Sequence, residues 1–100
     1  MGLFTGVRAV LTANDVLKRI ESCFEMLNYN LDSGNLAQAR TYCNEIAARA
    51  REFVEILEKS KTAEVSVYKF NGRKYKSLPL IIMITDVIDH TDKALKSLGY

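Results

Sequence analysis

Residues 35–60 of this 100-residue chain read NLAQARTYCNEIAARAREFVEILEKS, and they predict the helix on which the rest of the fold depends. Their apolar positions recur at spacings of three and four residues, which places them on one face of an α-helix: Leu36, Ala39, Cys43, Ile46, Ala50, Phe53 and Leu57. Asn35, with Gln38 three residues later, fits a capping box at the helix start. At about 1.5 Å per residue the helix would be roughly 39 Å long, so other segments have to cover its apolar face.

The preceding residues predict the first of those partners. A second apolar face begins after Thr12, which together with Asp15 again fits a capping box, and it consists of Val16, Ile20, Cys23, Leu27 and Leu31. Gly34 can adopt the left-handed conformation that ends a helix, and the next helix begins at once. A connection this short predicts an antiparallel helical hairpin formed by residues 12–33 and 35–60.

The segment around this turn, residues 29–42, resembles the turn of a tetratricopeptide-type repeat. The resemblance consists of the Gly34-Asn35 turn, an alanine five residues after the glycine, and the aromatic residue Tyr42 three residues further on. It implies a pair of packed antiparallel helices. Because repeat arrays need about three units and the chain has no second copy of the segment, we interpret it as one helical hairpin.

The N-terminal segment, residues 1–11, reads MGLFTGVRAVL and is apolar with helical spacing, although two glycines weaken it. It lacks a basic leader, and Arg8 interrupts its apolar run, so no export signal is predicted. Membrane-surface helices usually carry several basic residues, so we expect this segment to pack on the helices or on another copy and not on a membrane. No stretch approaches the roughly 18 apolar residues of a membrane span.

Length and composition indicate a single domain, residues 1–100, of ordinary soluble type. The chain has 48% hydrophobic and 26% charged residues, and its net charge of +2 does not by itself imply nucleic acid. Cys23 and Cys43 both lie on predicted apolar faces, where we expect reduced, buried thiols. A disulfide between the helices would form only if the protein were exported to an oxidising compartment. Because no export signal is predicted, the expected location is the reducing cytoplasm.

Residues 64–77 change to the period of a β-hairpin. Asn71-Gly72 supplies the positive φ angles of a type I′ turn, and its two-residue loop pairs Phe70 with Arg73, Lys69 with Lys74, Tyr68 with Tyr75 and Val67 with Lys76. One face then holds the aromatic side chains. We expect it to lie on the helices or to pair with the edge of another chain, because an isolated hairpin is marginal in water.

A third long helix is predicted over residues 79–98, since Pro79 suits the first turn of a helix. Its apolar face is wider than those of the two earlier helices and extends almost all round its first two turns. The alternative is that residues 78–84 form a third strand. The excess of apolar surface predicts an oligomer interface, formed by Leu80, Ile81, Ile82, Met83 and Ile84.

No catalytic, cofactor or metal site is predicted. His90 is the only histidine, which excludes histidine-rich zinc sites. Asp86 lies one helical turn before it, but neighbouring Asp–Lys pairs at the same spacing indicate a solvated, ion-paired face. The chain has no glycine-rich phosphate loop and no nucleophile motif. We therefore expect a protein that is not an enzyme.

The predicted hairpin is the one place where charge is uneven. From Val65 to Leu78 there are four basic residues and no acidic ones, interleaved with aromatic residues. Such a combination suits nucleic acid or an anionic nucleotide, with possible contacts from Lys69, Arg73, Lys74, Lys76, Tyr68 and Tyr75. The alternative is that the lysines protect strand edges from unwanted pairing.

These patterns predict an α+β fold, mostly α, in which a helical hairpin and a β-hairpin are followed by a third long helix packed on the bundle. The predicted function is that of a small interaction or assembly protein that self-associates through apolar helix faces and contacts another protein. Its size would suit an adaptor, an inhibitor or an accessory protein of a phage or mobile element. The alternative is a binder of nucleic acid or an anionic nucleotide through the β-hairpin.

Overall fold

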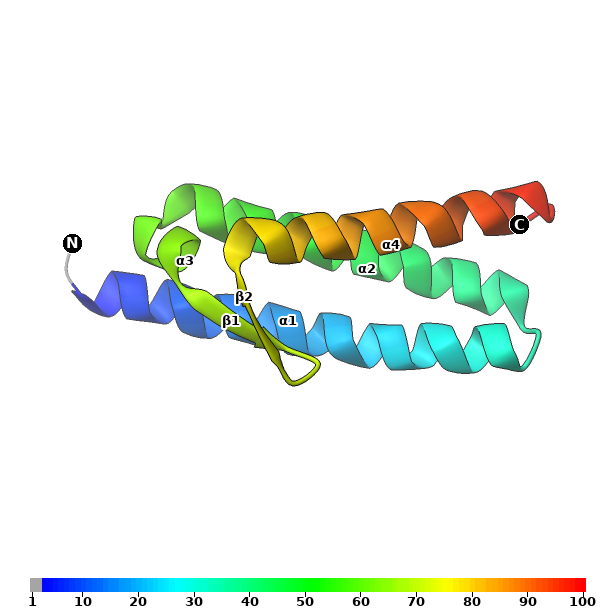
Figure 1. Cartoon of the computed structure of the whole chain (residues 1–100), viewed down its shortest axis with the longest axis horizontal. Coiled ribbons are helices and arrows are strands. Elements are labelled where there is room, and N and C mark those ends of the chain that lie inside the picture. Colours follow the sequence, from blue (N-terminus) through cyan, green and yellow to red (C-terminus); the bar gives the residue numbers. More distant parts are fainter. Residues whose placement is uncertain (1–2) are drawn as a thin grey trace.

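Helices α1 (Leu3–Asp32) and α2 (Leu36–Lys59) form the predicted antiparallel hairpin in a computed structural model of the chain. After α2 come α3 (Lys61–Val65), the strands β1 (Val67–Phe70) and β2 (Arg73–Lys76), and α4 (Ser77–Ser97). The structure describes residues 3–100, with side chains from Thr5 onward, so the first two residues of the predicted segment 1–11 lie outside the described residues. The fold is α+β and mostly α, as predicted. Figure 1 shows α4 running alongside α2 in an elongated body of 49 × 21 × 18 Å.

Helix α2 is the central element, because α1 and α4 both pack against it. Its buried side chains are those of the predicted apolar face, with Leu36 only partly buried. Gly34 has φ +76°, the left-handed conformation expected at the end of α1. The predicted capping box is wrong, because the side chain of Asn35 makes no capping hydrogen bond.

Helix α1 begins at Leu3, so the helix boundary predicted at Thr12 is wrong. The Thr12 hydroxyl donates to the carbonyl of Arg8, 2.9 Å away, as a threonine inside a helix does. Two residues of the N-terminal segment, Ala9 and Val10, pack against the core and continue the apolar face of α1. Residues 3–11 therefore extend the first helix instead of forming a separate segment.

Gly6 marks the closest approach between α1 and α3. A Cβ atom at this position would lie 2.6 Å from the Thr62 hydroxyl and 2.9 Å from the Thr62 Cβ, well inside van der Waals contact. The glycine that weakens the helix in isolation is thus required by packing. Its cost to helix formation is on the order of 1 kcal/mol relative to alanine, which close packing against α3 has to offset.

The β-hairpin has the predicted register, with Tyr68 opposite Tyr75 and Val67 opposite Lys76. Asn71 and Gly72 have φ +51° and +80°, as a type I′ turn requires. The predicted span of 64–77 is too long, because each strand has four residues and the segment before β1 forms α3. The hydroxyl of Ser60 caps α3 by accepting from the backbone N–H of Ala63 at 3.2 Å.

The aromatic face of the hairpin lies on the helices. Tyr68 is 1% exposed, its ring packs edge-on against Phe53 at a centroid distance of 5.2 Å, and its hydroxyl donates to the carbonyl of Ala63 at 2.5 Å. Phe70 is also buried and packs edge-on against Phe24 of α1. These contacts hold the hairpin against the helices, with β1 packed on α1 and β2 beside the first turns of α4 (Figure 1).

Helix α4 begins at Ser77, so residues 78–84 are helical and the alternative of a third strand is wrong. Pro79 lies in the first turn, as predicted, and the Ser77 hydroxyl donates to the carbonyl of Glu64 at 2.6 Å. Near its other end, Asp92 of α4 forms an ion pair with Arg40 of α2 at 2.7 Å. Both halves of α4 are thus held on the bundle.

The two cysteines differ in exposure. Cys43 is buried, as expected, but Cys23 is only half-buried at the edge of the α1–α2 interface, so its predicted full burial is wrong. Burial raises the pKa of both thiols, and carboxylates act in the same direction, Glu45 on Cys23 and Asp92 on Cys43. Both cysteines are free thiols.

We predict that Gly6→Ala destabilises the protein by about 1 kcal/mol, because overpacking against Thr62 costs more than alanine gains in helix propensity. Thermal unfolding followed by circular dichroism should show a fall of roughly 4–8 °C in Tm. Thr62→Ala in the Gly6→Ala background should restore part of the loss, because it removes the nearest atom. A rise in Tm for Gly6→Ala alone would contradict the close approach of α1 and α3.

For the thiols we predict that a disulfide reagent modifies Cys23 in the folded protein, whereas Cys43 reacts only when the protein unfolds. The variants Cys43→Ser and Cys23→Ser report each thiol separately, and the denatured chains provide the reference rates. Because the thiolate is the reacting form and the pKa of Cys23 is raised, its labelling should remain slower than in the denatured chain and accelerate as pH increases. Equal rates for the two folded variants would contradict this assignment.

Candidate interaction site

Three of the five predicted interface residues lie in the protein's own core. Leu80 is buried and lines no groove, so its assignment to an oligomer interface is wrong. Ile81 and Ile84 are buried as well, but they form part of the wall of the groove described below, and Met83 is partly buried. Only Ile82 is largely exposed, at 59%. The reason is that α2, α3 and the β-hairpin together cover most of the wide apolar face of α4.

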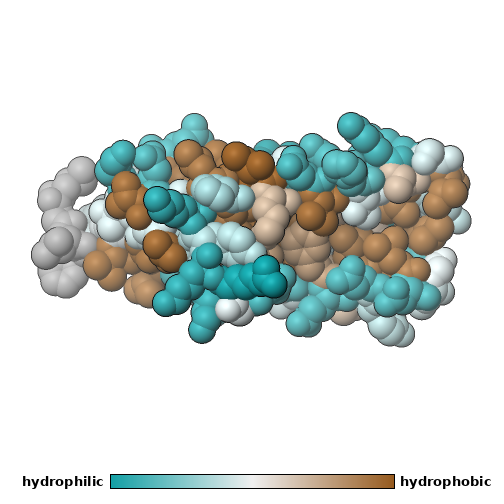
Figure 2. Space-filling view, viewed as in Figure 1, coloured by the Kyte–Doolittle hydropathy of each residue, from teal (hydrophilic) through white to brown (hydrophobic). Residues whose placement is uncertain are grey.

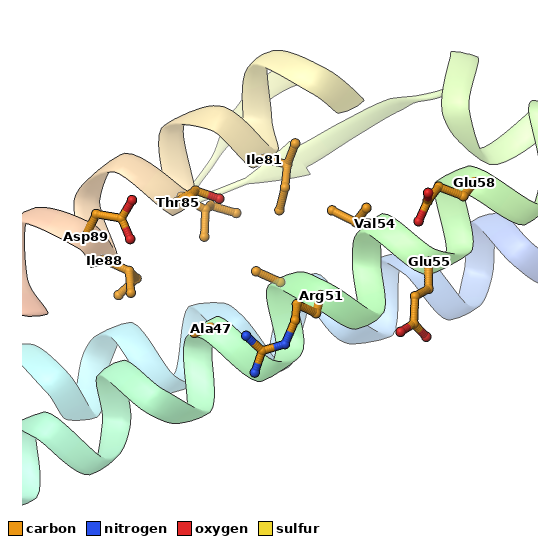
Figure 3. A pocket seen from close by; sticks show the side chains of 11 residues that line it. Ala47, Arg51, Val54, Glu55, Glu58, Ile81, Thr85, Ile88 and Asp89 are labelled. Atoms are coloured by element: carbon orange, nitrogen blue, oxygen red, sulfur yellow. The ribbon is translucent and has the colours of Figure 1, made fainter.

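The strongest candidate site is a groove of about 420 Å³ between α2 and α4, here called the α2–α4 groove. Figure 3 shows Val54 reaching into it from α2, and Ile81 and Ile88 from α4. Ala47 and Ala50 complete the α2 wall, and Ile84 completes the α4 wall. The groove exists because the two alanines are too short to reach α4.

The rim of the α2–α4 groove is acidic. Glu55 and Glu58 of α2 and Asp89 of α4 supply three carboxylates, against the single guanidinium of Arg51. Figure 3 shows these charged groups at the two edges of the groove, around the apolar side chains. Among the residues that the structure describes, none of these four side chains forms an ion pair with another residue.

Exposed apolar side chains adjoin the groove on α4. Leu78 and Ile82 lie on the same side of the helix as Thr85 and Asp89, which line the groove, because the spacings of three and four residues repeat. Leu78 is exposed to the same extent as Ile82. Figure 2 shows hydrophobic side chains near the first turns of α4. Because Leu78 and Ile82 share a side of α4 with residues that line the groove, these turns continue its apolar surface.

A second surface is the outward face of the β-hairpin, here called the basic hairpin face and formed by Val67, Lys69, Lys74 and Lys76. All four side chains are exposed. In the described part of the chain none of its lysines pairs with a carboxylate. Figure 2 shows hydrophilic side chains over the hairpin.

The predicted nucleic-acid contacts divide between the two faces of the hairpin. Tyr68 is buried, and burial raises the pKa of its hydroxyl, so its assignment as a contact is wrong. Tyr75 is partly buried, and Arg73 is exposed near the turn on the inner face, opposite Phe70. The three lysines of the basic hairpin face therefore remain exposed as cationic contacts, whereas the buried ring of Tyr68 is not available to stack on a base.

A further hollow of about 360 Å³ lies where the hairpin meets α1 and α4. Arg73 and Tyr75 line it together with Phe24, which the sequence analysis did not assign to any site. The α2 wall of the α2–α4 groove was not among the residues predicted for a site. The density of alanines in residues 47–50 is the signal that could have indicated a gap there.

The chemical features of α4 are those of an exposed helix surface. Asp86 and His90 are both exposed, and Nδ1 of His90 lies 2.9 Å from the backbone carbonyl of Asp86, not from its carboxylate. Within residues 3–100, no three metal-ligating side chains come together.

None of the helices over the described residues is long and apolar enough to cross a membrane. Comparisons of the chain with protein-family models, with curated proteins and with solved structures found no match.

Proposed function

We propose that this protein is a small non-enzymatic interaction protein that self-associates through the α2–α4 groove and the adjoining turns of α4. The observation that carries the proposal is a groove with apolar walls that continues into exposed Leu78 and Ile82. Apolar surface of this kind, bordered by charged residues, is typical of interaction sites. The role would be that of an adaptor, an inhibitor or an assembly factor.

Comparing the free energy gained by burying side chains with the free-energy cost of association shows that the proposed interface needs both the groove and the adjoining turns. Covering one exposed aliphatic side chain contributes about 1.5–3 kcal/mol, whereas association costs at least about 4 kcal/mol in translational and rotational freedom. Leu78 and Ile82 together would do little more than offset that cost. Stable association therefore needs side chains in the α2–α4 groove as well, so the groove belongs to the proposed interface.

We predict that the wild-type protein self-associates and that Ile82→Asn weakens association at least about tenfold, because an unpaired polar group would replace buried apolar surface. Ala47→Leu should have a similar effect by filling the groove. The matched controls are Leu11→Asn, since Leu11 is 61% exposed on α1, and Ala37→Leu on the exposed side of α2. Sedimentation equilibrium over a concentration series measures the effect, and a wild-type protein that remains monomeric at millimolar concentration would contradict the proposal.

The second candidate function is binding of nucleic acid or an anionic nucleotide through the β-hairpin. The observation that favours it is the exposure of Lys69, Lys74 and Lys76 on one face, in a hairpin without acidic residues. Phosphate contacts need only such cations, because they carry affinity without reading sequence. A nucleotide could instead use Arg73 and the aromatic side chains of the hollow between the hairpin, α1 and α4.

For this candidate we predict that changing Lys69, Lys74 and Lys76 to Gln weakens binding to every oligonucleotide sequence tested. The slope of log affinity against log salt should fall by about 0.7–0.9 per lost phosphate contact. Because the side chains are exposed, stability should change by less than about 0.5 kcal/mol. The same change at three exposed lysines outside the hairpin, Lys18, Lys59 and Lys93, is the control. Equal loss in both variants would exclude a specific role for the hairpin.

A further inference from the structure

We infer that the α2–α4 groove binds the basic hairpin face of a second copy of this chain, so that the protein assembles head to tail. The inference rests on the proposed function, self-association, and names the surfaces that meet. One is concave, apolar and acidic at its rim, and the other is convex and basic. Both belong to the same chain, which therefore carries a complementary pair of surfaces.

Charge is the first argument for this pairing. Glu55, Glu58 and Asp89 leave the rim with more negative than positive charge, and the basic hairpin face carries three lysines and no carboxylate. Neither set is neutralised by ion pairs within the described residues. At about 0.1 M salt such charges interact over only about 10 Å, so they have to be brought into contact to gain from each other.

Pairing either surface with its own counterpart would bring like charges together. A groove packed on a groove would place carboxylates against carboxylates, with only Arg51 of each copy to offset them. Hairpin against hairpin would place lysines against lysines. Like charges juxtaposed across an interface are unfavourable. Groove against hairpin is the combination that pairs opposite charges.

The apolar parts of the two surfaces also match. Val67 lies among the lysines of the hairpin face, and Val65 at the end of α3, two residues before it in the chain, is also exposed. Lysine side chains can lay their methylene groups on an apolar surface while the ammonium group reaches a carboxylate at the edge. The walls of the groove supply the surface, and its rim supplies the carboxylates.

A single chain cannot fill its own groove with its hairpin. The inner face of the hairpin is fixed on α1 by the Phe70–Phe24 contact, and the backbone N–H of Asn71 donates to the Glu21 carboxylate at 3.0 Å. The groove lies between α2 and α4, on a different side of the bundle (Figures 1 and 3). The pairing therefore has to be intermolecular, and it leaves one free groove and one free hairpin unless a ring closes.

The test uses two charge-reversal variants of the full chain. One, the hairpin variant, changes Lys69, Lys74 and Lys76 to Glu, and the other, the groove variant, changes Glu55, Glu58 and Asp89 to Lys. Each variant alone should associate at least about tenfold more weakly than wild type, because its two surfaces now carry the same sign. Mixing the two should restore association, and so should a chain that carries all six changes, because opposite charges again meet.

The outcomes separate the inference from the proposed function. A hairpin variant that self-associates like wild type, or a mixture that remains monomeric, would overturn head-to-tail pairing while self-association itself stands. A wild-type chain that never associates would overturn both. An oligonucleotide that binds the hairpin without competing with self-association would also overturn the pairing, because the same lysines cannot serve two ligands at once.

Should a reversed variant fail to fold, by circular dichroism, neutral variants give the same test. Changing the three lysines to Gln, or the three carboxylates to Gln and Asn, should weaken association and reduce its dependence on salt. Wild-type association should itself weaken as salt rises from 0.1 to 1 M, where the screening length falls from about 10 to about 3 Å. Association that strengthens with salt in wild type would contradict the pairing.

Discussion

The burial of Tyr68 is the interaction on which the placement of the β-hairpin and of α4 depends. Its ring packs against Phe53 of α2, and its hydroxyl satisfies the carbonyl of Ala63 at the end of α3. Because successive residues of a strand point to opposite faces, placing Tyr68 inward sends Lys69 outward. Its strand partner Tyr75 likewise faces inward while Lys74 faces outward. One buried side chain thereby orients the hairpin and creates an exposed basic face.

The same anchor also positions α4. The second strand leads directly into Ser77, whose hydroxyl bonds to the carbonyl of Glu64, one residue from the Ala63 carbonyl that binds Tyr68. Helix α4 therefore begins at a fixed point beside α3 and continues along α2. Further along α4, α2 presents Ala47 and Ala50 towards it, whereas the larger Phe53 of α2 packs against Tyr68. The two alanines line the α2–α4 groove that remains between the helices.

The net charge is only +2, but basic and acidic side chains gather on different parts of the surface, the hairpin face and the groove rim. Several charges are paired within the chain, as in Arg40 with Asp92 and Arg49 with Glu52. The charges of the hairpin face and of the groove rim are not among them. Exposed ion pairs contribute little to stability, about 0–1 kcal/mol, so leaving these charges unpaired costs the fold little. It also leaves them available to a partner, which is the physical basis of the proposed assembly.

The sequence by itself determined the features that depend on local periodicity and turn chemistry. The apolar face of residues 35–60, the left-handed Gly34 and the register set by Asn71-Gly72 all follow from interactions between residues near one another in the chain.

The tertiary structure decided whatever depends on a distant partner. Gly6 is acceptable in α1 because Thr62 approaches it, and Leu80 is buried whereas Ile82 is exposed because α2, α3 and the hairpin cover only part of α4. The lysines of the basic hairpin face were predictable, since the alternation of side chains along a strand places them on one face. The groove was not, because a cavity is the space left between helices from different parts of the chain.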